Sequence, residues 1–220
     1  MNQEQVDKTL KKTIGILERC NIEYRMLGSV VFAAMYGKVH RKIGDIDLLI
    51  DKKKQDVFFE ELKKLGYKRA GGMFAFGRKY LALETLIHDN LLSVGYFFGS
   101  FEKNGDFRMG GKVISVFVES NSITSTPYEL NGISFIGIPE RAIAVGIMQS
   151  ANNPKRKKEV SFLKANSIEP FPTDGMHVRI LGLSVDWLYK GAMKLFNLLG
   201  ALRTKFGLPY DPWRSKIGHK

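Results

Sequence analysis

Two aspartates, Asp45 and Asp47, carry the clearest chemical information in this sequence of 220 residues. They begin a segment in which Ile46, Leu48 and Ile50 alternate with polar positions, a pattern typical of a β-strand with one buried face. Residues two apart in a strand point to the same side, so the two aspartates lie on one face, about 7 Å apart along the backbone, and their carboxylates can converge. Magnesium is commonly held by one or two carboxylates together with nucleotide phosphates. The spacing therefore predicts a site for Mg²⁺, or Mn²⁺, and a triphosphate.

A turn at Gly28-Ser29 supplies a second feature suited to phosphate. It follows an alternating segment at 22–27 that predicts a strand, and it precedes a short apolar segment at 30–36 that predicts a helix. A glycine allows close approach of the backbone, and a helix N-terminus offers unpaired N–H donors with a positive dipole end. We expect this turn to cradle the phosphates of a nucleotide.

Arg41 lies between these two features, four residues before Asp45. Its forked guanidinium can bind phosphate, or it can pair with Asp45 or Asp51 and hold the strand in place. Of these two roles the residue types favour the pairing. The single histidines His40 and His88 have no second ligand at metal-binding spacing, which favours surface or turn roles for both.

The order strand, Gly-Ser turn, short helix, arginine and Asp-x-Asp strand resembles the DNA polymerase β-like nucleotidyltransferase superfamily, over residues 23–65. It is most similar to the small prokaryotic branch of antibiotic nucleotidyltransferases and toxin–antitoxin partners. The resemblance implies transfer of a nucleoside monophosphate from a triphosphate to a hydroxyl of an RNA, a protein or a small molecule. It implies catalytic and metal-binding roles for Asp45 and Asp47, and nucleotide-binding roles for Gly28, Ser29 and Arg41.

The third carboxylate of such enzymes, which serves as base and metal ligand on a later strand, aligns here with Gly95 in Ser-Val-Gly-Tyr-Phe. The sequence leaves four substitutes open: Glu84, Asp89, Glu102 and Asp106. If none of them takes the role, the alternative is a catalytically impaired module of the same fold that binds nucleotide, a partner protein or RNA. Further along, Pro139-Glu140 and the run 156–159, with Glu159 in place of the usual Asp, resemble a family segment whose basic residues face the triphosphate or acceptor.

The remaining pattern predicts an α/β (α+β) fold: a mixed sheet flanked by helices, with a C-terminal helical extension. Pro170 and Pro172 divide the chain into a nucleotidyltransferase-like domain at 1–168 and a linker, amphipathic helix and basic tail at 169–220. Apolar spacing places the last helix around Leu183 to Leu199. The other expected helices are at 4–17, 55–65, 140–148 and 155–164; the other expected strands are at 45–50, 73–76, 80–87, 91–98, 112–118 and 132–138; and turns are expected at 71–72, 89–90 and 99–100.

The net charge of +12 favours a polyanionic partner or reflects ordinary solvated lysine faces. Basic runs at 52–54 and 155–158, with Tyr210, Trp213 and Arg214, are candidates for RNA contact, and a basic RNA-binding module with an incidental Asp-x-Asp is a third hypothesis. Cys20 is the only cysteine, and there is no apolar leader or spanning segment. These features predict a soluble cytoplasmic protein without membrane contact. The sequence leaves the oligomeric state open.

Overall fold

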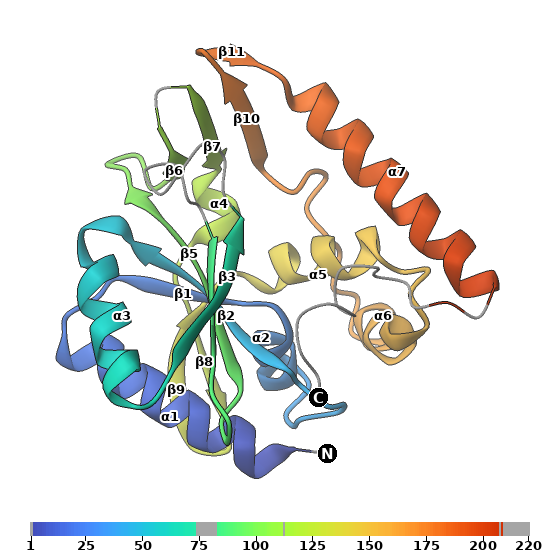
Figure 1. Cartoon of the computed structure of the whole chain (residues 1–220). Coiled ribbons are helices and arrows are strands. Elements are labelled where there is room, and N and C mark those ends of the chain that lie inside the picture. The colour runs from blue at the N-terminus through green and yellow to red at the C-terminus, as the bar shows by residue number, and fades with distance from the viewer. Residues whose placement is uncertain (1, 74–82, 112, 207, 209–220) are drawn as a thin grey trace.

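The computed structural model describes residues 2–73, 83–111, 113–206 and 208 (Figure 1). Its described strands form one mixed sheet in the order β11-β10-β7-β6-β5-β2-β1-β9-β8, and β4 branches from β5 and carries β3. The α/β class with a mixed sheet and flanking helices, predicted from the sequence, is confirmed. Within the described residues, no helix is long and apolar enough to cross a membrane.

The first five predicted elements are present with small shifts at their ends. Helix α1 (Gln3–Arg19) buries Val6, Leu10 and Leu17 on one face, and Asn21 takes a positive φ of 49° where the chain turns into the sheet. Then follow β1 (Tyr24–Leu27), α2 (Gly28–Met35), β2 (Asp45–Asp51), the 3₁₀ turn η1 (Lys52–Lys54) and α3 (Gln55–Lys64).

Strand β2 lies at the centre of the sheet, antiparallel to β1 and parallel to β5 (Ser93–Phe101). Its Ile46, Leu48 and Ile50 are fully buried, as the alternation predicted. Helices α1 and α3 lie side by side across one face of the sheet, where Phe58 of α3 packs edge-to-face on Tyr96 of β5 (Figure 1). This packing fixes β2 and therefore the positions of its two N-terminal aspartates.

The middle of the chain differs from the predicted boundaries. Gly71-Gly72 and Gly99-Ser100, expected as turns, lie inside strands, because β3 and β5 gain pairing partners that a local pattern does not reveal. The predicted strand at 73–76 falls almost wholly outside the described residues. The strands of this region are β3 (Lys68–Met73), β4 (Leu83–Ile87), β6 (Phe107–Gly110), β7 (Ile114–Val118), β8 (Thr126–Leu130) and β9 (Ile133–Gly137), with the short helix α4 (Ser120–Ile123) before β8.

Helix α5 (Glu140–Gln149) begins after Pro139, as predicted, and η3 (Pro154–Arg156) leads into α6 (Lys157–Ala165). The chain then forms two strands that the sequence did not predict, β10 (Met176–Ile180) paired with β7 and β11 (Leu183–Ser184) at the sheet edge. Leu183 therefore belongs to β11, and the last helix, α7 (Asp186–Lys205), begins after it and stands away from the sheet (Figure 1).

Candidate active site

The features predicted to bind metal and nucleotide meet at one edge of the sheet. Leu27, the last residue of β1, is paired with Asp47, and Asp47 is paired on its other side with Gly95 of β5. Directly paired residues in adjacent strands project to the same face. The Gly28-Ser29 turn, the half-buried carboxylates of Asp45 and Asp47, and Gly95 are therefore neighbours, although they come from three separate parts of the chain.

The carboxylate of Asp47 is flanked by two glycines. A Cβ atom at Gly28 would lie 3.0 Å from Asp47 Oδ2, and a Cβ at Gly95 would lie 2.9 Å from Asp47 Oδ1. Gly28 also has a φ of +66°, a left-handed conformation that costs an L side chain about 1 to 2 kcal/mol. The absence of side chains at these two positions gives the Asp47 carboxylate its space.

Ser29 and Arg41 are joined by a hydrogen bond. Arg41 Nη2 donates to Ser29 Oγ at 2.8 Å, which ties the loop before β2 to the N-terminal turn of α2. The backbone N–H groups of a helix's first turn have no partner inside the helix, and they carry the positive end of its dipole. The turn therefore presents donors beside the two carboxylates, with a guanidinium at its border.

The carboxylate that pairs with Arg41 is Glu159 of α6, which neither sequence-based role for Arg41 had named. Arg41 Nε donates to Glu159 Oε1 at 2.8 Å, Arg156 Nη1 donates to Oε2 at 2.5 Å, and His40 Nε2 lies 3.2 Å from Oε1. Glu159 is fully buried. Burial alone would raise its pKa, but the hydrogen bonds from His40, Arg156 and Arg41 outweigh burial and hold the pKa at about 2.

This arrangement also corrects two smaller expectations. His40, Arg41 and Arg156 with Glu159 form what we call the Glu159 cluster. The side chain of His40 is only 3% exposed and belongs to this cluster rather than to the surface. Arg156, which the sequence grouped with basic residues facing a triphosphate, forms an ion pair with Glu159 instead. The Glu159 cluster was not predictable from spacing, because 118 residues separate Arg41 from Glu159.

Of the four acids considered as substitutes for the third carboxylate, Glu84 lies on the wrong face. It is paired with Tyr96, whereas Thr85 is paired with Gly95, so Glu84 projects to the face opposite Asp47. There it is buried, forms an ion pair with Arg69 and accepts a hydrogen bond from the Tyr96 hydroxyl. Glu84 therefore contributes to packing on the face of the sheet that α3 covers.

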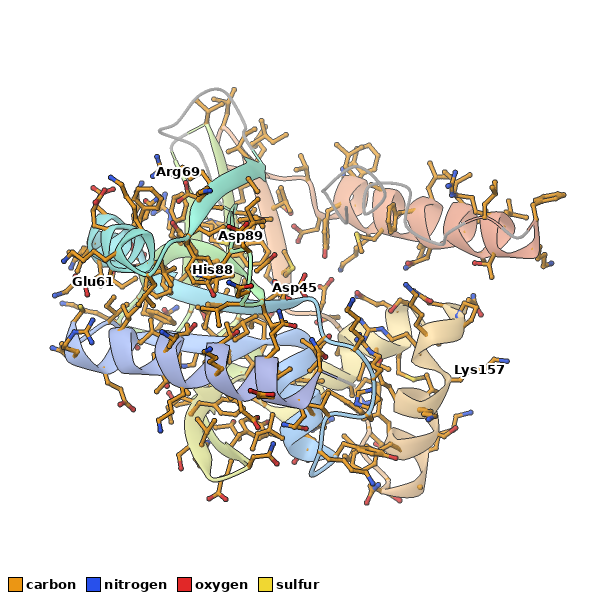
Figure 2. The ribbon with its side chains drawn as sticks, turned by 60° about the horizontal axis from the view of Figure 1, so that its bottom comes forward. Asp45, Glu61, Arg69, His88, Asp89 and Lys157 are labelled. Carbon is orange, nitrogen blue, oxygen red and sulfur yellow. The ribbon has the colours of Figure 1, made fainter. Side chains whose placement is uncertain are left out.

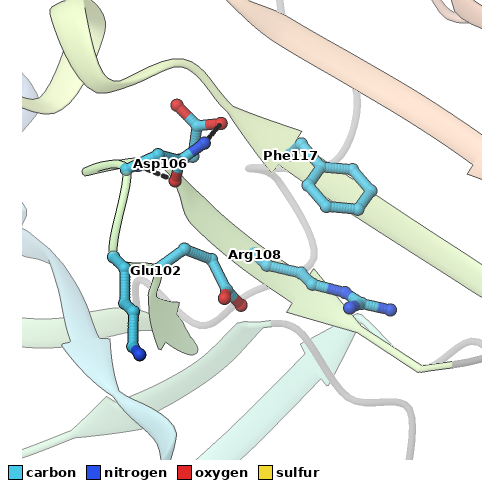
Figure 3. Close-up of a pocket in the computed structure, with 6 residues that line it drawn as sticks. Glu102, Asp106, Arg108 and Phe117 are labelled. Carbon is cyan, nitrogen blue, oxygen red and sulfur yellow. Dashed lines mark hydrogen bonds between the residues drawn. The ribbon is translucent and has the colours of Figure 1, made fainter.

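Glu102 and Asp106 lie beyond the opposite edge. Glu102 follows Gly95 by seven residues along the chain, a separation of about 23 Å at the rise of a strand. Asp106 accepts hydrogen bonds from Ser120 N and from Asn104, which fixes the turn between β5 and β6 (Figure 3). Both acids border a separate hollow of about 480 Å³ with Arg108 and Phe117.

Asp89 is exposed and follows β4 at the same edge as Asp45, since the end of β4 runs beside the start of β5 (Figure 2). Even so, the described residues contain no group of three His, Cys, Asp or Glu side chains placed to hold a metal ion. The donors that the described residues place at this edge therefore suit a divalent cation held by two carboxylates and nucleotide phosphates, and among these residues no set of three carboxylates is formed.

No protein-family model matches the sequence, and no curated protein matches it. Several solved structures, in contrast, match the fold of this chain. The lincosamide antibiotic adenylyltransferase LnuA, solved with lincomycin bound, superposes with a TM-score of 0.57 at 17% identity, over 74% of this chain and 97% of that one. The antibiotic-resistance factor ANT(2'')-Ia matches over 94% of this chain and 95% of its own, with a TM-score of 0.51 and 16% identity. A crystal structure of ANT(2'')-Ia in complex with adenylyl-2''-tobramycin gives 0.52 at 13% identity, over 92% and 99% of the two chains.

The chain has the nucleotidyltransferase fold. At these identities the similarity is one of backbone arrangement, and it confirms the fold expected from the Gly-Ser turn and the Asp-x-Asp strand. Within the nucleotidyltransferase fold of this chain, the beginning of α5 also approaches the candidate site. Ile138 N donates to Met26 O at 3.1 Å, so α5 begins at the edge where β1 ends.

Proposed function

We propose that this protein binds a nucleoside triphosphate with Mg²⁺, or Mn²⁺, at Asp45 and Asp47 and transfers its nucleoside monophosphate to a hydroxyl acceptor. The observation that carries the proposal is the pairing of Leu27, Asp47 and Gly95 across three strands. It brings the Gly-Ser turn beside two carboxylates that have space between glycines, on the fold shared with the antibiotic nucleotidyltransferases.

Each residue has a stated part in this proposal. Asp45 and Asp47 hold the cation, which when bound neutralises phosphate charge and polarises the phosphorus under attack. The backbone of Gly28 and the first turn of α2 bind phosphate oxygens. Arg41, held between Ser29 and Glu159, places positive charge next to them.

The glycine at position 95 cannot serve as a base in this reaction. Because no side chain is present at this position, the proton of the attacking hydroxyl has to leave to solvent or to a group on the acceptor. This observation also favours a second candidate function, a catalytically impaired module of the same fold that binds nucleotide, and in which Asp45 and Asp47 serve affinity alone.

We assign residues 1–168 to the nucleotidyltransferase-like domain and residues 169–220 to its extension, and we place the protein in the cytoplasm on the basis of its single cysteine. The acceptor is an RNA, a protein or a small molecule. The solved relatives LnuA and ANT(2'')-Ia, whose structures contain lincomycin and adenylyl-2''-tobramycin, make antibiotics with free hydroxyls reasonable test acceptors.

The test is incubation of the full chain with each labelled nucleoside triphosphate, Mg²⁺ or Mn²⁺, and an acceptor panel of total RNA, protein extract, a lincosamide and an aminoglycoside. Transferred label and released pyrophosphate are both measured, and the Asp45→Ala/Asp47→Ala double variant is the control. Label that disappears in the control supports transfer. Cation-dependent nucleotide binding without transfer supports the impaired module, and turnover that survives the double substitution contradicts the proposed roles of both aspartates.

A further inference from the structure

Two basic segments that are far apart in the sequence lie side by side next to the candidate active site. One is the loop after α2, with Lys38 and Lys42, and the other is the start of α6. The hydrogen bonds of Glu159 to His40 and Arg41 join them. Glu159 is the single acidic residue in either segment, 37–44 or 154–161, and it is buried against two arginines. The exposed lysines that remain are Lys38, Lys42, Lys155, Lys157 and Lys158.

These five lysines form what we call the α6 lysine patch. None of them lies within ion-pair distance of a carboxylate in the described part of the chain. Figure 2 shows Lys157 projecting outward from α6, away from the sheet. Five like charges on joined segments, without acidic neighbours at their tips, attract a polyanion more strongly than scattered lysines that are each balanced locally.

A hollow beside the patch adds aromatic surface to the charge. Its volume is about 460 Å³, and the ring centroids of Tyr36 and Phe162 within it are 5.1 Å apart. Lys157, Lys158 and Ser161 complete the rim. Proteins that bind single-stranded nucleic acids combine aromatic rings, on which bases stack, with basic groups that follow the backbone. This hollow has both components in contact.

The patch is continuous with the nucleotide site. Helix α2 begins at the Gly-Ser turn and ends at Tyr36, about 11 Å away at 1.5 Å per residue. On the other side, Arg41 contacts Ser29 directly and is linked through Glu159 to α6. A strand bound along the lysines with a base at Tyr36 would therefore reach the phosphate-binding turn within a few nucleotides.

We propose that the α6 lysine patch and the Tyr36 hollow bind a single-stranded polynucleotide whose end is the acceptor at the active site. The acceptor role rests on the proposed function, whereas the binding does not. In the transfer, the terminal hydroxyl oxygen forms a bond to the α-phosphorus of the triphosphate. The bond from that phosphorus to the bridging oxygen breaks, pyrophosphate leaves with the electron pair, and the hydroxyl proton passes to solvent.

The chain offers a matched control for the charge of the patch. Lys52 and Lys53 of η1 are adjacent and exposed like Lys157 and Lys158, but they follow the opposite end of β2 from Asp45. The same double reversal of charge can therefore be made at the patch or at the far end of β2, about 20 Å from Asp45 along that strand. The change in net charge is identical in the two variants.

The experiment measures binding of fluorescent oligo-rU and oligo-dT to the full chain by anisotropy, without nucleotide, over a range of salt concentrations. Lys157→Glu/Lys158→Glu is expected to weaken binding at least tenfold and to reduce the salt slope by about 1.4, because each lost phosphate contact on a single strand removes about 0.7. Lys52→Glu/Lys53→Glu is expected to change affinity less than threefold. Tyr36→Ala is expected to weaken binding about fivefold at unchanged slope, as loss of stacking does.

The outcomes separate this proposal from the proposed function. Equal losses in the two charge reversals, or no binding of either oligonucleotide at low salt, overturn the α6 lysine patch as a site. Asp45→Ala/Asp47→Ala is expected to keep the wild-type affinity for the oligonucleotides. Patch-dependent binding without label transfer to the bound strand would retain the site and reject the strand as the acceptor. A preference between the two oligonucleotides would tell RNA from DNA.

Discussion

Asp47 lies beside Gly28 and Glu159 binds Arg41, and these two carboxylates have different surroundings. Asp47 is half-buried, and a Cβ atom at Gly28 or at Gly95 would lie 3.0 or 2.9 Å from one of its oxygens. Glu159 is fully buried, and its two oxygens are contacted by Arg41, Arg156 and His40. Two glycines leave space beside the first, whereas the second is enclosed by three basic side chains.

This difference separates a buried carboxylate with several basic partners from a half-buried carboxylate that we propose binds a cation. A buried charge is tolerated only when it is paired, and a depressed pKa of about 2 shows that Glu159 is charged and paired at neutral pH. The left-handed glycine next to Asp47 carries a conformational cost. The comparison therefore predicts that substitutions at Glu159 affect folding first and that those around Asp47 affect ligand binding first.

The largest effect is expected from Glu159→Ala. Removal of the carboxylate leaves Arg41 and Arg156 next to a cavity without their partner, and breaking a buried ion pair in this way costs about 3 to 5 kcal/mol. The free energy of unfolding from urea denaturation measures the loss. Glu129→Ala, at an exposed position on β8, is the control and is expected to change stability by less than about 0.5 kcal/mol. If Glu159→Ala lowered the free energy of unfolding by less than about 1 kcal/mol, the structural role that distinguishes Glu159 from Asp47 would be contradicted.

A smaller effect is expected at the two glycines, and it differs between them. Gly28→Ala forces an L side chain into the left-handed region and should lower the free energy of unfolding by about 1 to 2 kcal/mol. Gly95→Ala meets only the end of the Asp47 side chain, which can rotate, and should cost less than about 1 kcal/mol. Both should weaken cation-dependent nucleotide binding, measured by calorimetry. Equal stability losses would show that contact with Asp47, rather than backbone conformation, sets the cost.

A gain of function is the third expectation. Gly95→Asp places a carboxylate on the strand beside Asp47, at the position that aligns with the third carboxylate of the family that the chain resembles, provided that the Asp47 side chain rotates to admit it. We expect Mn²⁺ affinity, measured by calorimetry, and any nucleotidyl transfer to rise about tenfold, equivalent to about 1.4 kcal/mol. Gly95→Asn, with the same shape and no charge, is the matched control. A rise of equal size in the asparagine variant would contradict a role for the added charge.

The local features of this site were readable from the sequence, whereas its long-range contacts were not. Alternation of apolar residues fixed β2 and therefore the common face of Asp45 and Asp47. Pro139 marked the start of α5 for a local reason, since its missing N–H is not needed there. The strands β10 and β11 were not predicted because they are ordered by long-range pairing, β10 with β7 and β11 with β10, and their half-exposed or exposed residues show no local periodicity.

The partner of Arg41 was not predicted from the sequence, for a related reason. Sequence distance favoured Asp45 or Asp51, but packing of α6 against α2 through Phe32 and Phe162, with ring centroids 5.4 Å apart, brings Glu159 to the arginine. The visible sign of such a cluster was an acid, Glu159, directly after the run of basic residues at 155–158. Contacts that depend on the docking of two helices require the tertiary structure.

The smallest effect is expected at His177, where the same type of pairing occurs at the surface. His177 Nδ1 lies 2.8 Å from Asp186 of α7 and Nε2 lies 2.9 Å from Glu119, and its side chain is 41% exposed. Hydrogen bonds to Glu119 and Asp186 raise the pKa of His177 above its usual 6.5. A raised pKa in the folded state means that the stabilisation is fully present below about pH 6.5 and is lost as the pH rises through the folded value.

Solvent reduces the size of this contribution to less than about 1 kcal/mol, well below that of the buried Glu159 cluster. The measurement is the difference in free energy of unfolding between the wild type and His177→Gln, at about pH 6 and about pH 9. We expect the wild-type advantage to be present at the lower pH and to shrink at the higher one. If the advantage instead matched the loss in Glu159→Ala, burial would not be what separates the two carboxylate clusters, and the contrast between Asp47 and Glu159 would need another physical cause.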